Sequence, residues 1–242
     1  MAKLKIAYIT CYDLNCDTAA TEHITQIVNG LGKLGHKIWL YAKNCGKRDF
    51  DNNVYTVNVG SGKCLFFDKK IYNRYLKESK EFDIVYLRDF IGAMRIIDWA
   101  KKSGIPIIIE HNGLEHIESL HNSKLMARSI TSIDCSHWLP KRIRKADLNI
   151  VVTSAIGKFL SQKYNIPSEK FVHIPNGVDI KRFHPAENKK SLRKSLNLTP
   201  ENAIWLGYIG SMYPWHLLKD VIMAFEIIAK RFDNVFLLLG GK

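Results

Sequence analysis

The sequence predicts an α/β protein built on a doubly wound, mostly parallel sheet, with a second and incomplete βαβ unit behind it. Short apolar runs alternate along the chain with longer segments of helical periodicity, which is typical of βαβ units. Of the 242 residues, 46% are hydrophobic and 24% are charged, a usual balance for a globular chain. No apolar run approaches the roughly 18–20 residues that a membrane-spanning helix needs.

The first two elements show the pattern clearly. Residues 4–10 (LKIAYIT) form an apolar run of strand length, and the helix predicted over 21–34 has Ile24, Val28 and Leu31 at helical spacing. Gly35 is placed to end that helix. Further strands are expected over 37–41, 54–59, 83–87, 105–110, 148–152 and 171–174, and further helices over 66–80, 90–102 and 154–164. Residues 113–145 favour helix without a clean periodicity.

A second unit begins after residue 185. Asn176-Gly177 is a turn signal, and the polar stretch 186–195 behind His184-Pro185 is interpreted as a linker. A strand over 204–209, a helix over 217–231 and a strand over 235–239 follow. This stretch is much shorter than the roughly 100–150 residues of a complete doubly wound domain. We therefore expect one domain over 1–185 and, over 186–242, a linker with the first βαβ unit of an incomplete domain.

The formal net charge of +13 is compatible with nucleic acid, an anionic membrane surface or an acidic small-molecule substrate. The basic runs 141–145 and 189–194 have no interleaved aromatic residues and match no nucleic-acid-binding module, so we interpret them as solvated faces. A nucleic-acid-binding function would rest on net charge alone and is not expected. Attraction to anionic lipid is the more plausible special use of these charges.

A metal site and a nicotinamide or P-loop site are both disfavoured. The five cysteines are odd in number and contain no Cys-x-x-Cys pair, and His111, His116 and His121 recur every fifth residue, which does not place them on one helix face. The first turn, residues 10–23, has no glycine to let a phosphate approach the backbone. Thr18 or Thr21 is best interpreted there as a helix N-cap.

Polar side chains follow the most apolar predicted strand, where Glu110, His111 and Asn112 stand in sequence. In open α/β sheets ligands bind at the carboxyl ends of strands, so these residues are site candidates. Turns and helix caps use the same residue types, so position alone leaves both interpretations open.

Four stretches together resemble glycosyltransferase family 4, whose members have the GT-B fold. The strongest is 171–179 (FVHIPNGVD) with Phe183 and Pro185, preceded by residues 151–154. The others are 207–216 leading to Ala224-Phe225, 19–23 with 34–38, and Arg88 through 110–113. The resemblance covers the whole chain. It implies two Rossmann-like domains that face each other, and transfer of a sugar from a nucleotide-sugar with retention at the anomeric carbon.

The resemblance also implies a set of site residues. His111 would contact the transferred sugar, and Glu110 or Asn112 would orient it or the acceptor, with His111 and Glu110 as the catalytic candidates. Gly210, Ser211 and His216 would bind the donor diphosphate, while Asn176 and Gly177 would line the cleft with Asn112. The first domain would hold a glycan or lipid-linked acceptor. No Asp-x-Asp motif is present, so neither a metal ion nor another cofactor is expected.

Departures from the family pattern keep a second hypothesis open. Residues 18–20 replace a glycine-rich turn, and Leu217 stands where a glycine is usual. The basic residue and the Glu-x7-Glu element that the family carries farther along its C-terminal domain are absent. We therefore expect a fragment that transfers sugar poorly by itself. The alternative is a truncated, non-catalytic module that binds an acceptor or an anionic surface. A cytoplasmic location, with peripheral contact to the inner face of the membrane, is expected in either case.

Overall fold

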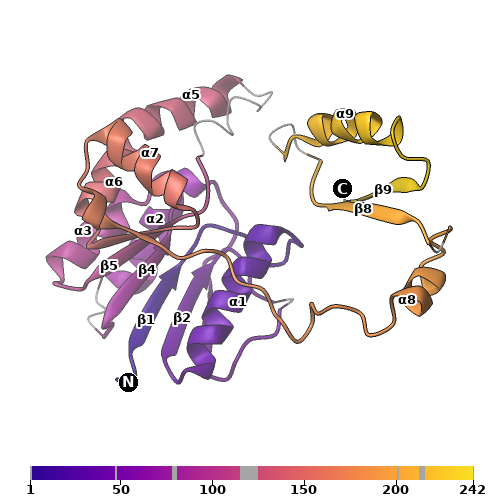
Figure 1. Cartoon of the computed structure of the whole chain (residues 1–242). Helices are drawn as coiled ribbons and strands as arrows, with labels where there is room; N and C mark the ends of the chain where they lie inside the picture. Colours follow the sequence, from indigo (N-terminus) through magenta and orange to yellow (C-terminus); the bar gives the residue numbers. More distant parts are fainter. Residues whose placement is uncertain are drawn as a thin grey trace. The chain divides into compact units, whose positions relative to one another are not determined.

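The computed structural model describes residues 2–46, 48–77, 81–114, 125–200, 202–212 and 216–241. The chain forms two compact units, Met1–Asn176 and Gly177–Lys242 (Figure 1). They divide nine residues before the expected boundary after residue 185, inside an exposed segment without regular structure. The assignment of two functional domains stays a prediction.

The N-terminal unit is built on a parallel sheet with the strand order β3-β2-β1-β4-β5-β6-β7. The predicted doubly wound α/β class is therefore confirmed. The chain moves outward from β1 to β3 and then returns to β4 on the other side of β1, which makes the β1–β4 junction the switch point of the sheet. The strands are β1 (Lys5–Ile9), β2 (Lys37–Ala42), β3 (Val54–Asn58), β4 (Ile84–Arg88), β5 (Ile107–His111), β6 (Leu148–Val151) and β7 (Phe171–His173).

The helices follow the predicted alternation, with two differences. The helix expected over 66–80 is α2, which continues into a π-helical turn, η1 (Tyr72–Leu76). A second π-helical turn, η3 (Asp134–Trp138), joins α5 to α6, and His116 and His121 lie outside the described residues. The helices are α1 (Ala19–Lys33), α2 (Cys64–Ile71), α3 (Met94–Lys102), α5 (Leu125–Ile133), α6 (Leu139–Lys145) and α7 (Ser154–Tyr164), and a 3₁₀ turn, η4 (Ser168–Lys170), precedes β7.

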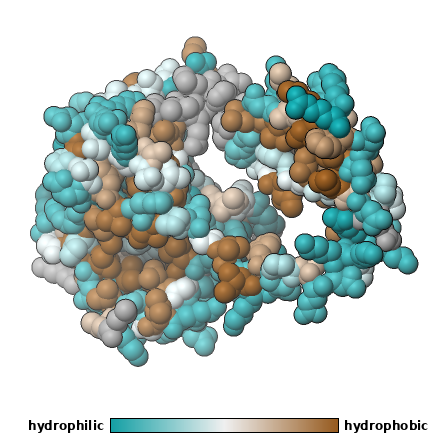
Figure 2. Space-filling view, in the orientation of Figure 1, coloured by the Kyte–Doolittle hydropathy of each residue, from teal (hydrophilic) through white to brown (hydrophobic). Residues whose placement is uncertain are grey.

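Helices cover both faces of this sheet. On one face Ile24 and Val28 of α1 pack with Tyr8 and Leu40 of the sheet. On the other face the core includes residues of α2 and α3, and Val85 and Leu87 of β4 are fully buried there. The first face is less completely covered, since Ile84 and Tyr86 of β4 stay partly exposed, and Figure 2 shows hydrophobic residues gathered over β4 and β5.

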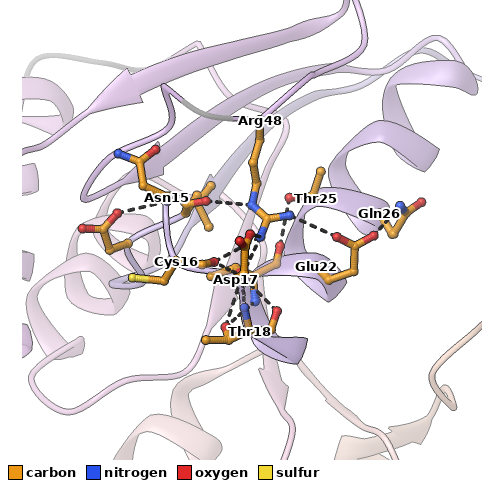
Figure 3. Close-up of polar contacts among 11 residues, drawn as sticks. Asn15, Cys16, Asp17, Thr18, Glu22, Thr25, Gln26 and Arg48 are labelled. Carbon is orange, nitrogen blue, oxygen red and sulfur yellow. Dashed lines mark hydrogen bonds and ion pairs between the residues drawn. The ribbon is translucent and has the colours of Figure 1, made fainter. Parts of the chain in front are cut away.

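The start of α1 confirms the capping interpretation of the first turn. Thr18 is the N-cap: its hydroxyl accepts from the Thr21 backbone N–H at 3.2 Å, and the Thr21 hydroxyl accepts in return from the Thr18 backbone N–H at 3.1 Å. Arg48 holds the glycine-free loop in front of this cap (Figure 3). Its guanidinium donates to the Leu14 and Cys16 carbonyls and to Glu22. The hydrogen bonds of one guanidinium group thus fix this loop.

The C-terminal unit contains two parallel strands, β8 (Ile204–Ile209) and β9 (Val235–Gly240), joined by α9 (Leu218–Ala229). A short helix, α8 (Lys189–Ser195), forms inside the predicted linker 186–195, with Asn188 as its N-cap, and none of its residues is buried. Among the described residues of this unit only Ala203 is buried. One helix covers only one face of a two-stranded sheet, so the apolar residues of the strands stay partly exposed.

Within the described residues, no helix is both long enough and apolar enough to cross a bilayer. No disulfide joins any of the five cysteines, all of which lie within the described residues, and Cys11, Cys45 and Cys135 are buried.

Gly92, in the loop between β4 and α3, gives a direct test of this packing. Its φ is +95°, and a Cβ there would lie 2.9 Å from the Leu65 carbonyl oxygen of α2. We expect Gly92→Ala to lower the free energy of unfolding by about 1–3 kcal/mol, measured by urea titration. Gly30→Ala is the matched control: Gly30 is exposed in α1 with no atom near its Cβ position, so we expect a gain of about 0.5–1 kcal/mol. Equal effects of the two changes would contradict the assigned contact.

Candidate functional site

A polar pocket lies at the carboxyl ends of β4 and β5, next to the switch point of the sheet. Its volume is about 200 Å³. This is the position at which open α/β sheets bind ligands. The predicted residues Glu110, His111 and Asn112 all line it. The other lining residues are Tyr12, Arg88, Asp89, Gly113, Leu114, Leu139 and Leu160.

Glu110 is a buried carboxylate at the end of β5, only 2% exposed. Its Oε1 lies 2.5 Å from His23 Nε2 of α1 and accepts from the Asn112 side-chain amide at 2.8 Å. Burial raises the pKa of Glu110, but the hydrogen bond with His23 and the charge of Arg88 outweigh it and hold that pKa below its ordinary value. Glu110 is therefore ionised at neutral pH and presents a hydrogen-bond acceptor.

Arg88, at the end of β4, carries a buried donor that no other described residue satisfies with a hydrogen bond. Its Nη1 is buried, lies 3.6 Å from Glu110 Oε1 and has no hydrogen-bond partner among the described residues. The guanidinium carbon lies 5.2 Å from the centre of the Tyr12 ring. Buried polar atoms are nearly always hydrogen-bonded, so an orphan donor at a pocket wall is a feature of a binding site.

His111 points away from Glu110 because successive residues of a strand face opposite sides of the sheet. Its Nε2 lies 3.0 Å from the Asn149 side-chain oxygen. The Asn149 amide nitrogen donates to the Ile143 and Lys170 carbonyls, so the Asn149 oxygen is the acceptor and His111 Nε2 carries the proton. Burial lowers the pKa of His111 and outweighs the opposing charge of Asp89, 3.7 Å from Nδ1. His111 is thus neutral at pH 7.

A fully buried arginine fixes the wall behind His111. Arg142 of α6 donates to both carboxylate oxygens of Asp89, at 2.7 and 3.1 Å, and to both of Asp134, each at 2.7 Å. Burial alone would lower the pKa of Arg142, but the two carboxylates raise it, and the guanidinium stays charged. The interpretation of run 141–145 as a solvated face is therefore wrong for Arg142, which has no exposed surface.

Sequence reasoning missed four members of this site: His23, Arg88, Asp89 and Arg142. Arg88 and Asp89 could have been found, because they follow the apolar run 84–87 as Glu110 follows its own strand. His23 and Arg142 carry no such signal, since Glu110 lies 87 residues from His23 and Asp89 lies 53 residues from Arg142 along the chain.

The three residues expected to bind the donor diphosphate, Gly210, Ser211 and His216, lie close together in the C-terminal unit. The Ser211 carbonyl lies 2.6 Å from His216 Nδ1, and the Gly210 N–H donates to the Gly240 carbonyl. Leu217, at the start of α9, has a φ of +54° in the left-handed region that favours glycine. This backbone suits the glycine that the resemblance places there.

Asn176 and Gly177 are exposed where the two units divide, and the described lining of the polar pocket does not include them. That they share a groove with Asn112, Gly210 and Ser211 stays a prediction. Over the described ranges, no group of three or more His, Cys, Asp or Glu residues could hold a metal ion.

Comparison with known proteins identifies the family. The model of Glycosyltransferase Family 4 matches residues 20–182, about two thirds of the chain. The chain belongs to glycosyltransferase family 4. The match includes every lining residue of the polar pocket except Tyr12, and it confirms the resemblance found in the sequence. No curated protein sequence matches the chain.

Solved structures confirm the fold. HepE from Anabaena, in complex with UDP-glucose, is 16% identical with a TM-score of 0.64, and the match covers 98% of this chain and 60% of HepE. The catalytic domain of starch synthase IV from Arabidopsis thaliana, bound to ADP and acarbose, is 16% identical (TM-score 0.62; 98% and 74% covered). UDP-N-acetylglucosamine 2-epimerase from Rickettsia bellii is also 16% identical (TM-score 0.52; 100% and 62% covered). This family 4 chain therefore spans about 60% of the length of HepE and has a fold that different activities share.

Replacing Arg142 tests the buried ion pairs. We expect Arg142→Leu to lower the free energy of unfolding by about 3–5 kcal/mol in a urea titration, because two buried carboxylates lose their partner. Lys145→Leu, in the same basic run, removes an exposed ion pair with Asp98 and should change stability by less than about 1 kcal/mol. A small effect at Arg142 would show that the carboxylates do not depend on it.

The neutral state of His111 predicts a pH dependence of stability. The folded protein protonates the His111 imidazole less readily than the unfolded chain does, in which this imidazole titrates near 6.5. The free energy of unfolding is therefore highest above that pH and falls as the pH drops below it. Between about pH 7 and pH 5 we expect the urea midpoint of the wild type to fall more steeply than that of His111→Gln. His184→Gln controls for the loss of one imidazole. Parallel slopes for all three proteins would contradict the assignment.

Proposed function

We propose that this family 4 chain belongs to a retaining glycosyltransferase that moves a sugar from a nucleotide-sugar donor to a glycan or lipid-linked acceptor. The observation that carries the proposal is the polar pocket at the carboxyl ends of β4 and β5, where an ionised Glu110 lies beside the neutral His111. The chain would supply the acceptor domain and the beginning of the donor domain.

The chemistry explains why the pocket combines these groups. Breaking the bond to the diphosphate develops positive charge on the sugar, and donors and acceptors fixed in advance stabilise it without reorganisation. Glu110 is already held by His23 and Asn112, and its lowered pKa keeps it ionised, so it is a weak base and a charged hydrogen-bond acceptor. We assign it to orienting a hydroxyl group of the acceptor or of the transferred sugar.

His111 has the complementary role. Its ring is fixed by Asn149, and as a neutral group it contacts the transferred sugar without adding positive charge where positive charge develops. Arg88 adds the orphan Nη1 donor, which is suited to a ligand oxygen. His111 and Glu110 are thus the proposed catalytic residues, and Asn112 and Arg88 assist in binding.

The donor diphosphate would bind at the loop that enters α9. Gly210, Ser211 and His216 lie together there, and the N-terminus of α9 has no side-chain cap to satisfy its first N–H groups. Helix N-termini bind phosphate through such N–H groups and the helix dipole. The nucleotides in the solved structures of HepE and starch synthase IV support a nucleoside diphosphate as the leaving group.

We further propose that transfer needs no metal ion and takes place in the cytoplasm, with peripheral contact to an anionic membrane surface. The net charge of +13 supports the last point. A truncated, non-catalytic module that binds an acceptor or an anionic surface is the second candidate, and the exposure of the C-terminal unit favours it, because only Ala203 is buried among the described residues of that unit.

Nucleotide release tests the proposal. The chain is incubated with a panel of UDP-, ADP- and GDP-sugars and with glycan or lipid acceptors, and we expect turnover well below about one per second, the low end for competent enzymes. Glu110→Gln should lower kcat/KM by about 100-fold, the usual effect of removing one preorganised group. Asp98→Asn, which removes an exposed carboxylate of α3, should leave it unchanged.

Titration of the same nucleotide-sugars into the chain separates the two candidates. Binding of a nucleotide-sugar that weakens on Ser211→Pro, which removes one backbone donor, supports the transferase. Acceptor binding with no nucleotide binding at any concentration would favour the non-catalytic module.

A further inference from the structure

Two cysteines that lie 53 residues apart in the sequence bring their sulfur atoms together. Cys11 follows β1, Cys64 is the first residue of α2, and the two Sγ atoms are 2.7 Å apart. No disulfide joins them in this structure. A disulfide bond is about 2.05 Å long, so a movement of less than about 1 Å would bring the two sulfurs to bonding distance.

The surroundings of Cys64 favour the thiolate, which is the reactive form of a cysteine. Its Sγ lies 3.6 Å from Lys43 Nζ, and Cys64 stands at the start of α2, where the helix dipole is positive. The hydrogen bond with Cys11 and the charge of Lys43 outweigh the effect of burial and lower the pKa of Cys64 to about 6. Cys64 is therefore mostly a thiolate at pH 7.

The other buried cysteine of this region has the opposite character. Burial, with the charge of Asp13, raises the pKa of Cys45 to about 12, so Cys45 stays a thiol. Cys64 is half-buried, whereas Cys11 is only 7% exposed. A small reagent in solution would therefore react first at Cys64, and Cys11 is placed to react second.

This pair of cysteines is connected to the wall of the polar pocket through Tyr12. Tyr12 follows Cys11 directly, lines the pocket and lies against the guanidinium of Arg88. The Tyr12 carbonyl accepts from the backbone N–H of Lys43 at 3.0 Å, and the side chain of the same lysine contacts Cys64. A covalent bond between Cys11 and Cys64 would therefore restrict the backbone that carries Tyr12.

We propose that Cys11 and Cys64 form a reversible disulfide by reaction with a small disulfide such as oxidised glutathione. The Cys64 thiolate attacks one sulfur of the reagent, whose S–S bond breaks, and one glutathione leaves as a thiolate. The Cys11 thiol gives its proton to that thiolate and attacks the Cys64 sulfur, which forms the Cys11–Cys64 bond and releases the second glutathione. The two cysteines lose two electrons, which reduce the reagent to two glutathione molecules.

A reversible bond fits the proposed cytoplasmic location, because disulfides in that compartment are usually transient, catalytic or redox-sensing ones. The inference goes beyond the proposed function and does not depend on it, since the bond forms whether or not the chain transfers sugar. Its consequence for the site is that the Tyr12 wall of the pocket is more rigid in the oxidised chain than in the reduced one.

The test equilibrates the whole chain with mixtures of reduced and oxidised glutathione, blocks the remaining thiols with N-ethylmaleimide and maps disulfides by peptide mass spectrometry. We expect a Cys11–Cys64 bond in the wild type that excess reduced glutathione removes. Cys16→Ser, which removes an exposed cysteine of the same loop, is the matched control and should form the bond equally. The chain unfolded in urea should need at least about 30-fold more oxidised glutathione, because only the folded chain holds the sulfurs together.

Alkylation by iodoacetamide gives a second readout. The rate at Cys64 should rise with pH around a midpoint near 6 in the wild type. In Cys11→Ala that midpoint should lie at least about one pH unit higher, because the thiolate loses its hydrogen bond. Amide hydrogen exchange over residues 10–14 should slow at least about 5-fold in the oxidised wild type.

Three results would overturn the inference. They are a glutathione adduct that stays on Cys64 without passing to Cys11, a bond from Cys64 to Cys16 in place of Cys11, and equal oxidation of the folded and the unfolded chain. Unchanged hydrogen exchange over residues 10–14 would overturn the restriction of Tyr12. The mapping in the wild type decides the matter even where Cys11→Ala fails to fold.

Discussion

Arg142 donates to Asp89 and Asp134 from a position without solvent exposure, and this double ion pair ties α6 and η3 to the loop that follows β4. Removing a guanidinium and two carboxylates from water costs several kcal/mol per ion, and only close, bidentate hydrogen bonds offset that cost. The polar pocket needs the arrangement because the Asp89 carboxylate lies 3.7 Å from His111 Nδ1. Asp134 in turn lines a second, apolar cavity together with Leu65, Ile133 and Trp138. Both cavities therefore depend on one buried charge.

Two adjacent residues of β5 acquire different charge states from their surroundings. The pKa of Glu110 and that of His111 are both lowered, yet the same direction leaves the carboxyl charged and the imidazole neutral. Strand geometry sends Glu110 toward His23 of α1 and His111 toward Asn149 of β6, so each meets a different set of partners. In a transferase, a charged carboxylate would stabilise the developing positive charge, and a neutral imidazole would not oppose it.

The fold alone does not decide between activities. Starch synthase IV and a UDP-N-acetylglucosamine 2-epimerase match this chain at the same 16% identity. A shared doubly wound fold places ligands at the carboxyl ends of its strands, whatever reaction follows. At that edge this family 4 chain carries a hydrogen-bonded Glu110 and a buried Arg88 Nη1 that has no hydrogen-bond partner among the described residues.

The sequence by itself determined the order of the elements, the Thr18 cap and the placement of Glu110, His111 and Asn112 at a strand end, because periodicity, capping and strand ends are local properties. The strand 204–209 and the helix 154–164 have the predicted bounds. Only the tertiary structure decided that Arg142 is buried within an otherwise basic run and that His23 pairs with Glu110. These features depend on contacts between residues far apart in the chain, and no local pattern encodes which partner burial will bring.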